Sequence, residues 1–195
     1  STQGYSSAAS DVYKRQEEEY TCDTLLLSVG LIPENELSDK LGVQLHPVTG
    51  GPVVNESLET SIPGVFACGN VLHVHDLVDF VSQEATMAGN CAAAYVKTGR
   101  TEETEEIPVK CGSGVRYTVP AKIRPAYMEE KLPVRFRVGQ VYQKASITVR
   151  SGDTVLLRKK RPIMAPGEME TVYIKKDSLS PDNIGNDITI SIEEE

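Results

Sequence analysis

One stretch, residues 60–70 (TSIPGVFACGN), constrains the fold more than any other part of the chain. Pro63 and Gly64 predict a turn, because proline fixes φ and glycine tolerates positive φ. The apolar run of residues 65–68 is typical of a short buried strand. Gly69 then stands at the C-terminal end of that strand. In an open α/β sheet ligands bind at this end, and a glycine there lets a ligand approach the backbone closely.

A helix is predicted behind this stretch, over residues 82–96. The segment is rich in alanine, and Gly99 stands where a helix C-terminus commonly has glycine. Asp79 or Ser82 could cap its start. A helix N-terminus at this place would present free N–H groups and a positive dipole end to an anionic or electron-rich ligand.

The pattern T-S-x-P-G-V-F-A-x-G-(D/N) of residues 60–70 resembles the last flavin-binding segment of the pyridine nucleotide-disulphide oxidoreductase superfamily, which includes thioredoxin reductase. The resemblance implies FAD as cofactor and NAD(P)H as co-substrate. In that superfamily the residue after the glycine is usually Asp, which bonds a ribityl hydroxyl of FAD. Here it is Asn70, whose amide oxygen can accept the same hydrogen bond. The resemblance also implies that the backbone N–H groups of Val81, Ser82 and Gln83 face the flavin O2/N1 edge.

The segment before the motif carries further signals. Residues 22–30 are apolar nearly throughout, which predicts a strand buried on both faces of a parallel or doubly wound sheet. The turn that follows, from Gly30 to Asn35, is similar to the one where chains of that superfamily return from the NAD(P)H domain to the FAD domain, so Gly30 joins Gly69 and Asn70 as an implied cofactor contact. Residues 36–41 predict a short helix, and residues 43–54 a hairpin or two short strands.

No G-x-G-x-x-G motif follows any strand, and this is the element that cradles the FAD pyrophosphate in dinucleotide-binding folds. We therefore expect residues 17–104 to be the closing part of a doubly wound FAD-binding domain, a fragment of a larger oxidoreductase. The parent would pass electrons from NAD(P)H through FAD to an acceptor. The fragment alone is expected to bind FAD weakly or not at all and to be inactive.

Residues 1–16 are rich in Ser, Ala and Gln without an apolar period, which predicts a disordered tail. Residues 6–16 (SSAASDVYKRQ) resemble an in-frame translation of a transposase adaptor used to prepare sequencing libraries. This hypothesis makes the tail a cloning or assembly scar, which plays no part in the fold.

The texture changes after the acidic connector of residues 100–106, and residues 105–195 predict a separate all-β domain. Strand-like alternation or β-branched enrichment recurs at residues 115–119, 134–138, 145–149, 154–157, 171–174 and 187–192. Short strands separated by Pro and Gly predict a small antiparallel sandwich of immunoglobulin-like texture. The chain has no Trp, so the Cys-Trp-Cys hallmark of immunoglobulin domains is absent.

Charge and composition exclude several classes of function. The formal net charge is −8, with 28 acidic and 20 basic residues, so the chain repels nucleic acid. No apolar run approaches the ~20 residues that span a bilayer, and no signal-peptide pattern is present, which predicts a cytoplasmic protein. The four cysteines form no C-x-x-C pair, which speaks against structural zinc and against a redox dithiol.

Two histidines, His73 and His75, suggest a metal site. Two residues apart on an extended segment, their imidazoles would point to opposite faces, so no metal site is predicted. A role beside the flavin and plain surface polarity stay open for both.

Two other functions stay open as well. The β domain could make the chain an interaction or assembly module for a partner dehydrogenase subunit or a homo-oligomer. The basic run of residues 158–161 is then either a docking patch or a solvated strand end. Alternatively, the chain is a non-enzymatic α/β protein whose sequence is similar to the flavin-binding segment but which does not bind flavin.

Overall fold

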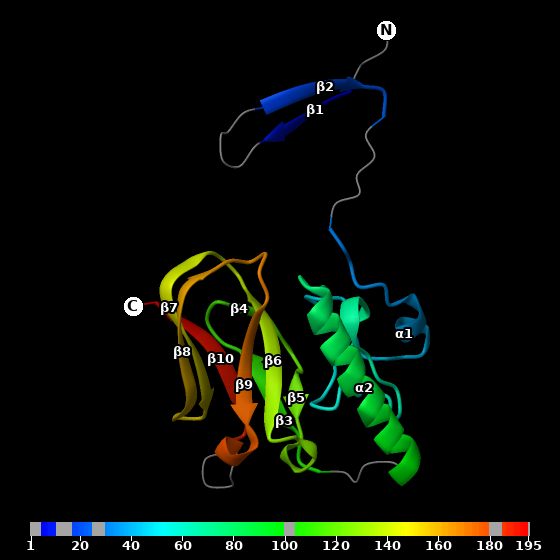
Figure 1. Cartoon of the computed structure of the whole chain (residues 1–195), viewed down its shortest axis with the longest axis vertical. Coiled ribbons are helices and arrows are strands. Elements are labelled where there is room, and N and C mark those ends of the chain that lie inside the picture. The colour runs from blue at the N-terminus through cyan, green and yellow to red at the C-terminus, as the bar shows by residue number, and fades with distance from the viewer. Residues whose placement is uncertain (1–4, 11–16, 25–29, 100–103, 180–184, 195) are drawn as a thin grey trace. The chain divides into compact units, whose positions relative to one another are not determined.

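The computed structural model describes residues 5–10, 17–24, 30–99, 104–179 and 185–194, in two units, Ser1–Leu31 and Ile32–Glu195. In the first unit, strands β1 (Tyr5–Ser10) and β2 (Glu17–Cys22) form an antiparallel hairpin (Figure 1). β1 lies in the segment predicted to be a disordered tail. A backbone ladder needs only N–H and C=O groups, so a strand can form there without an apolar period. The strand predicted over residues 22–30 falls largely on residues 25–29, outside the described residues.

The second unit begins with two helices. Helix α1 (Glu36–Lys40) confirms the short helix, although Leu37 is 80% exposed. Helix α2 (Val78–Thr98) starts four residues before the predicted position and ends at Gly99, whose φ of 81° and N–H bond to the Tyr95 carbonyl close it as expected. The predicted side-chain cap is wrong. Leu77 occupies the N-cap position, with no side-chain hydrogen bond.

The buried strand predicted over residues 65–68 is also wrong. Its only ladder contact is an isolated bridge between Glu59 and Phe66, and three of the four residues are half-buried. A strand in a doubly wound sheet is held by neighbours on both edges. Within the described residues this segment has a partner on one edge only, so it remains an extended loop. The hairpin of residues 43–54 is present in reduced form, with one bridge between Leu45 and Pro52.

Two sheets make up most of the remaining chain. The first has the order β5-β3-β10-β7-β8 and the second β4-β6-β9. All pairs are antiparallel except β10 with β3. Their bounds are β3 Ile107–Cys111, β4 Val115–Val119, β5 Lys122–Ile123, β6 Lys131–Val138, β7 Tyr142–Ser151, β8 Thr154–Met164, β9 Glu170–Lys175 and β10 Ile188–Glu194, with 3₁₀ turns η2 Pro125–Tyr127 and η3 Lys176–Leu179.

All of the strands predicted in this half are confirmed in place, and β3 and β5 are additional. The described chain as a whole is mostly β-sheet with few helices. This composition is compatible with the predicted closing part of an α/β domain followed by a β domain. The basic run of residues 158–161 lies within edge strand β8 and not at a strand end. There Arg158 pairs with Glu193 at 3.0 Å and Arg161 with Glu170 at 2.8 Å.

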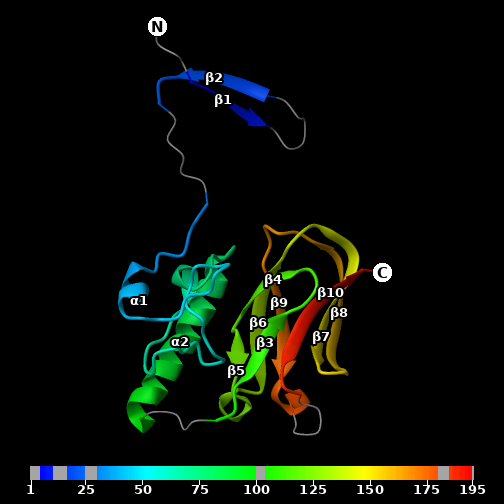
Figure 2. The ribbon, with the colours of Figure 1, turned by 180° about the vertical axis from the view of Figure 1, so that it is seen from behind.

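The three-stranded sheet is covered on its inner face and, along β4 and β6, on its outer face, whereas Tyr173 of β9 is 54% exposed on the outer face. On one face, Phe136 and its alternate neighbours on β6 share a core with apolar residues of the five-stranded sheet. On the other face, Tyr117 and Val119 of β4 pack with Leu72 and with Ala88 of α2. Figures 1 and 2 show α2 on the opposite side of the sheets from β8. The outer face of this sheet is therefore where the β strands contact residues 32–99, which form the first half of this unit.

A buried ion pair crosses the same junction. Arg124, which follows β5, donates from Nε and Nη2 to Glu56 Oε1 at 3.1 and 2.9 Å, and its backbone N–H donates to Glu56 Oε2 at 2.7 Å. Glu59 lies 3.4 Å from Nη1. The Glu56 side chain is 1% exposed and that of Arg124 is 8% exposed, so each charge depends on the other for compensation.

No helix in the described parts of the chain has the length and apolar character needed to cross a membrane.

Candidate functional site

The turn at Gly69 and Asn70 forms the start of a short 3₁₀ helix, η1 (Gly69–Val71). Gly69 is buried and has a φ of +70°, and a Cβ added there would lie 3.2 Å from Val81 Cγ1. Glycine is therefore favoured by backbone conformation, and any larger residue would also have to displace the Val81 side chain slightly. Asn70 is exposed, and its Oδ1 accepts the backbone N–H of His75 at 3.1 Å. The amide oxygen expected to bind a ligand already serves a contact within the chain.

The other predicted contacts are only partly brought together. Val81, Ser82 and Gln83 lie in the second turn of α2, because the helix begins at Val78. The free N–H groups of a helix belong to its first turn, and here they are those of Val78 and Asp79, since the Phe80 N–H donates to the Leu77 carbonyl at 3.2 Å. The side chains of Ser82 and Gln83 line an open groove of about 460 Å³. Gly30 belongs to the other unit of the chain.

The centre of the site is the Glu84 carboxylate, on the inner face of α2. Its side chain is fully buried. Oε1 accepts from His73 Nε2 at 2.8 Å and from Arg135 Nη1 at 3.1 Å, and Oε2 accepts from His75 Nε2 at 2.9 Å and from the Gly69 N–H at 2.9 Å. One carboxylate therefore joins the Gly69 turn, both imidazoles and strand β6.

The prediction that the two imidazoles point to opposite faces is wrong. Their ring centroids are 4.4 Å apart, and both rings meet the same carboxylate. The segment between them is a compact loop after η1, so the alternation of an extended strand does not apply. Surface polarity is excluded too, since His73 is 1% exposed and His75 is 9% exposed.

Burial and hydrogen bonding together set the protonation states of Glu84 and His73. Burial alone would raise the pKa of Glu84, but the hydrogen bonds from His73 and His75 outweigh it and lower that pKa to about 2. Burial also lowers the pKa of His73, against the opposing hydrogen bond to Glu84. At neutral pH Glu84 is thus ionised and His73 is neutral. Because a carboxylate only accepts, each Nε2 carries a proton, and both Nδ1 atoms are buried without a hydrogen-bond partner among the described residues.

Among the described residues, His73, His75 and Glu84 form the one group that could hold a metal ion, with ligand atoms within 4.8 Å of one another. Two contacts disfavour a cation. Arg135 already lies against the carboxylate, and a metal-bound imidazole normally donates its second nitrogen, which here has no acceptor. The donor set fits a hydrogen-bond network better than a metal centre.

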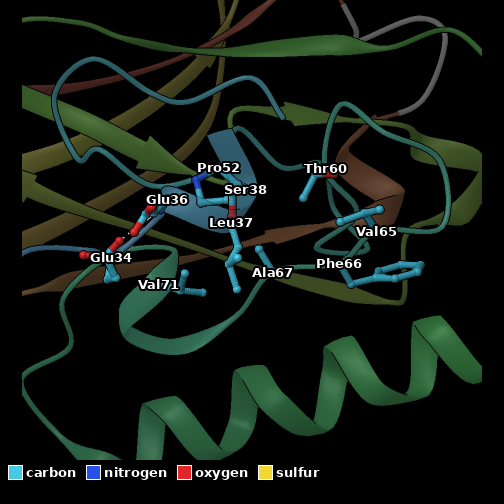
Figure 3. Close-up of a pocket in the computed structure, with 10 residues that line it drawn as sticks. All are labelled: Glu34, Glu36, Leu37, Ser38, Pro52, Thr60, Val65, Phe66, Ala67 and Val71. Carbon is cyan, nitrogen blue, oxygen red and sulfur yellow. Dashed lines mark hydrogen bonds between the residues drawn. The ribbon is translucent and has the colours of Figure 1, made fainter. Parts of the chain in front are cut away.

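A larger cavity lies on the side of α1, with a volume of about 520 Å³. Figure 3 shows Leu37 pointing from α1 toward Ala67, with Phe66 and Val71 on the same wall. The lining is mainly apolar, and the wall formed by residues 65–67 is the extended segment that leads into the Gly69 turn.

Stability should fall in two steps as the pH decreases. His73 has a lowered pKa in the folded state, so the unfolded chain binds the proton first and stability declines below pH ~6.5. Glu84 has an ordinary pKa of 4.5 and a folded value of about 2, so its contribution is complete above pH 4.5 and is lost as the pH falls toward 2. We expect this second step to be worth about 3 kcal/mol. Urea unfolding of the wild type and Glu84→Gln between pH 7 and 2 measures it.

The matched control is Glu36→Gln, whose side chain is 71% exposed in α1. The control should follow the wild-type pH profile, and Glu84→Gln should lack the lower step. If wild type and Glu84→Gln lose stability in parallel below pH 4.5, the account of Glu84 is wrong.

Sequence reasoning missed Glu84 and Arg135. A signal for Glu84 was present, because the inward stripe of α2 runs through Phe80, Met87, Cys91 and Tyr95, and Glu84 occupies a position in that stripe. A charge at an inward position needs a buried partner. Arg135 gave no such signal, since its alternation with Phe136 is that of any strand with one exposed face.

Comparisons with known proteins concern the first half of the chain. The family described as pyridine nucleotide-disulphide oxidoreductase matches residues 2–97, which include the Gly69 turn, both histidines and Glu84. A ferredoxin–NADP reductase of Picrophilus torridus is 38% identical over 79 residues, covering 38% of this chain and 24% of that protein. An NADH oxidase of Methanocaldococcus jannaschii is 32% identical over 81 residues, covering 42% of this chain and 17% of that protein.

The chain therefore spans about a quarter or less of the length of these two relatives. No solved structure matches it.

Proposed function

We propose that this chain is part of a flavoprotein of the pyridine nucleotide-disulphide oxidoreductase family, and that its Gly69–Asn70 turn and the start of α2 contact FAD. The comparisons support that family and a flavoprotein NAD(P)H oxidoreductase type of function. The observation that carries the proposal is the family match over residues 2–97, because it contains the turn and most of α2. FAD, when bound, would accept a hydride from NAD(P)H and pass electrons to a further acceptor.

The residues present fit one part of FAD. Asn70 is exposed next to a buried glycine, and its Nδ2 has no partner among the described residues, so it can donate to a ribityl oxygen. The first turn of α2 is exposed at Val78 and Asp79 and offers N–H groups to the pyrimidine edge of the flavin. The roles predicted for Val81, Ser82, Gln83 and Gly30 stay predictions. The sequence has no glycine-rich phosphate loop to hold the other end of FAD.

This arrangement predicts how the purified chain discriminates between flavins. Its contacts reach the ring and the ribityl chain only, so riboflavin, FMN and FAD should bind weakly and with similar affinity. Asn70→Leu should weaken all three by about two- to tenfold, the value of one hydrogen bond. Quenching of flavin fluorescence on titration with protein measures these affinities.

Asn186→Leu is the matched control, since Asn186 is an exposed asparagine just before β10 and lies outside the groove that Ser82 and Gln83 line. It should bind flavin as the wild type does. Absence of binding to all three flavins, or equal binding by Asn70→Leu, would contradict the proposal and favour the non-enzymatic α/β alternative. A strong preference for FAD over riboflavin would mean that the chain also holds the pyrophosphate.

An assembly role with a partner dehydrogenase subunit or a second copy stays an alternative. The β domain suggested this alternative, and the basic run on β8, its candidate docking patch, uses Arg158 and Arg161 for ion pairs within the chain. The flavin proposal therefore rests on the stronger observation.

A further inference from the structure

Arg135 is a buried cation on the outer face of the three-stranded sheet. Along β6, Val134 and Phe136 face the shared core, so Arg135 points to the opposite face, toward α2. The residue is 4% exposed. A guanidinium in such a place needs a counter-charge, because it is always protonated and costly to remove from water.

Helix α2 supplies that counter-charge and one further contact. Arg135 Nη1 donates to Glu84 Oε1 at 3.1 Å, and its guanidinium carbon lies 5.7 Å from the centre of the Phe80 ring. Strand β6 is thereby fixed against the first two turns of the helix, near its free N–H groups.

The same carboxylate carries the contact onward to the turn. Oε2 of Glu84 accepts the Gly69 N–H and His75 Nε2, and the His75 backbone N–H donates to Asn70 Oδ1. The path from Arg135 to the Asn70 side chain thus consists of hydrogen bonds whose donors and acceptors are buried until the last one. Among the described donors to Glu84, Arg135 is the one with a permanent charge, so its attraction to the carboxylate does not depend on a titrating proton.

We propose that Arg135 of the C-terminal sheets is a positioning residue for the Gly69–Asn70 turn and acts on it through Glu84. The β sheets then belong to the cofactor-contacting part of the molecule and are not an independent appendage. The inference rests on the proposed function only where it regards the turn as a flavin contact.

The test follows the flavin-free chain by NMR, in wild type and in Arg135→Met, Arg135→Lys and Arg124→Met. Four groups face the His73 ring and are considered together: Glu84 from α2, His75 from its own loop, Tyr117 from β4 and Arg135 from β6. Loss of the guanidinium charge should raise the pKa of His73, because the positive charge of Arg135 contributes to lowering it. The Gly69 amide resonance should move in the same variant, because its acceptor is reoriented. Arg135→Lys keeps the charge and should keep the pKa of His73 low.

Arg124→Met is the control for a loss of stability alone, since Arg124 is also a buried arginine paired with a glutamate but touches neither Glu84 nor the turn. It should leave the His73 titration and the Gly69 resonance at their wild-type values. The inference is overturned if Arg135→Met leaves both signals unchanged, or if Arg124→Met moves them equally. Should Arg135→Met fail to fold, Arg135→Gln removes the charge with a polar side chain and is judged by the same two signals.

A flavin titration separates this inference from the proposed function. Arg135→Met should weaken riboflavin binding by about two- to tenfold, as Asn70→Leu does. A change in His73 and Gly69 without any flavin binding by the wild type would retain the positioning role and remove the cofactor. Flavin binding that is unaffected by Arg135→Met would retain the cofactor and remove the positioning role.

Discussion

Replacing Glu84 by leucine is expected to lower the free energy of unfolding by about 3–5 kcal/mol at pH 7, the cost of leaving a buried charge without its partner. Leucine fits the inner face of α2, so the loss comes from the polar groups left behind. The Arg135 guanidinium loses its counter-charge, and the N–H groups of Gly69, His73 and His75 lose their acceptor. Urea unfolding followed by circular dichroism measures the difference.

Glu36→Leu, on the exposed surface of α1, serves as the control and should change stability by no more than about 0.5 kcal/mol. The double variant Glu84→Leu with Arg135→Met should recover part of the loss, since it removes both charges. A loss below about 1 kcal/mol in the single variant would mean that the carboxylate is not buried as described.

The second large effect is expected from Arg124→Met. The substitution leaves the Glu56 carboxylate buried beside Glu59 without a cation, and it should cost about 3–5 kcal/mol. Because the pair joins the loop of residues 55–59 to the segment after β5, we expect the two halves of the unit to lose contact before the sheets unfold. Thermal unfolding followed by the NMR resonances of the Tyr117 side chain and by far-ultraviolet circular dichroism would separate these events.

Arg116→Met is the matched control, because Arg116 is exposed on β4 and its loss should be nearly neutral. The double variant Arg124→Met with Glu56→Gln should be more stable than Arg124→Met alone. Equal stability of Arg116→Met and Arg124→Met would show that the buried pair does not hold the junction.

The parts of the fold predicted from the sequence are those that depend on local pattern. Residues 134–138 and 145–149 alternate or are β-branched, and each lies within a strand. Ser151 and Thr154 pair across the predicted Gly152 turn. Helix α2 was found from its alanine content and from Gly99. Propensity and turn chemistry act over a few residues, so they can be read without knowledge of partners.

The failures depend on partners that are distant in sequence. Residues 65–68 have strand composition but lack neighbours on both edges in the described chain, so they do not form a strand. His73 and His75 converge because they lie in a compact loop after the Gly69 turn and because both contact Glu84, which lies in the second turn of α2. Arg135 is buried only because α2 covers the outer face of β6, 51 residues from its carboxylate partner. A pattern that extends over a few residues cannot reveal a partner 51 residues away in the sequence.

The position of β10 has a consequence for the order of folding. Among the described strands β10 has the highest residue numbers, yet it lies in the middle of the five-stranded sheet, parallel to β3 and antiparallel to β7. During synthesis, β5-β3 and β7-β8 can form only as separate pairs until residues 188–194 emerge. The sheet then closes in a single late step over a long chain separation, which makes it slow to form and leaves the edges of β3 and β7 open until the end.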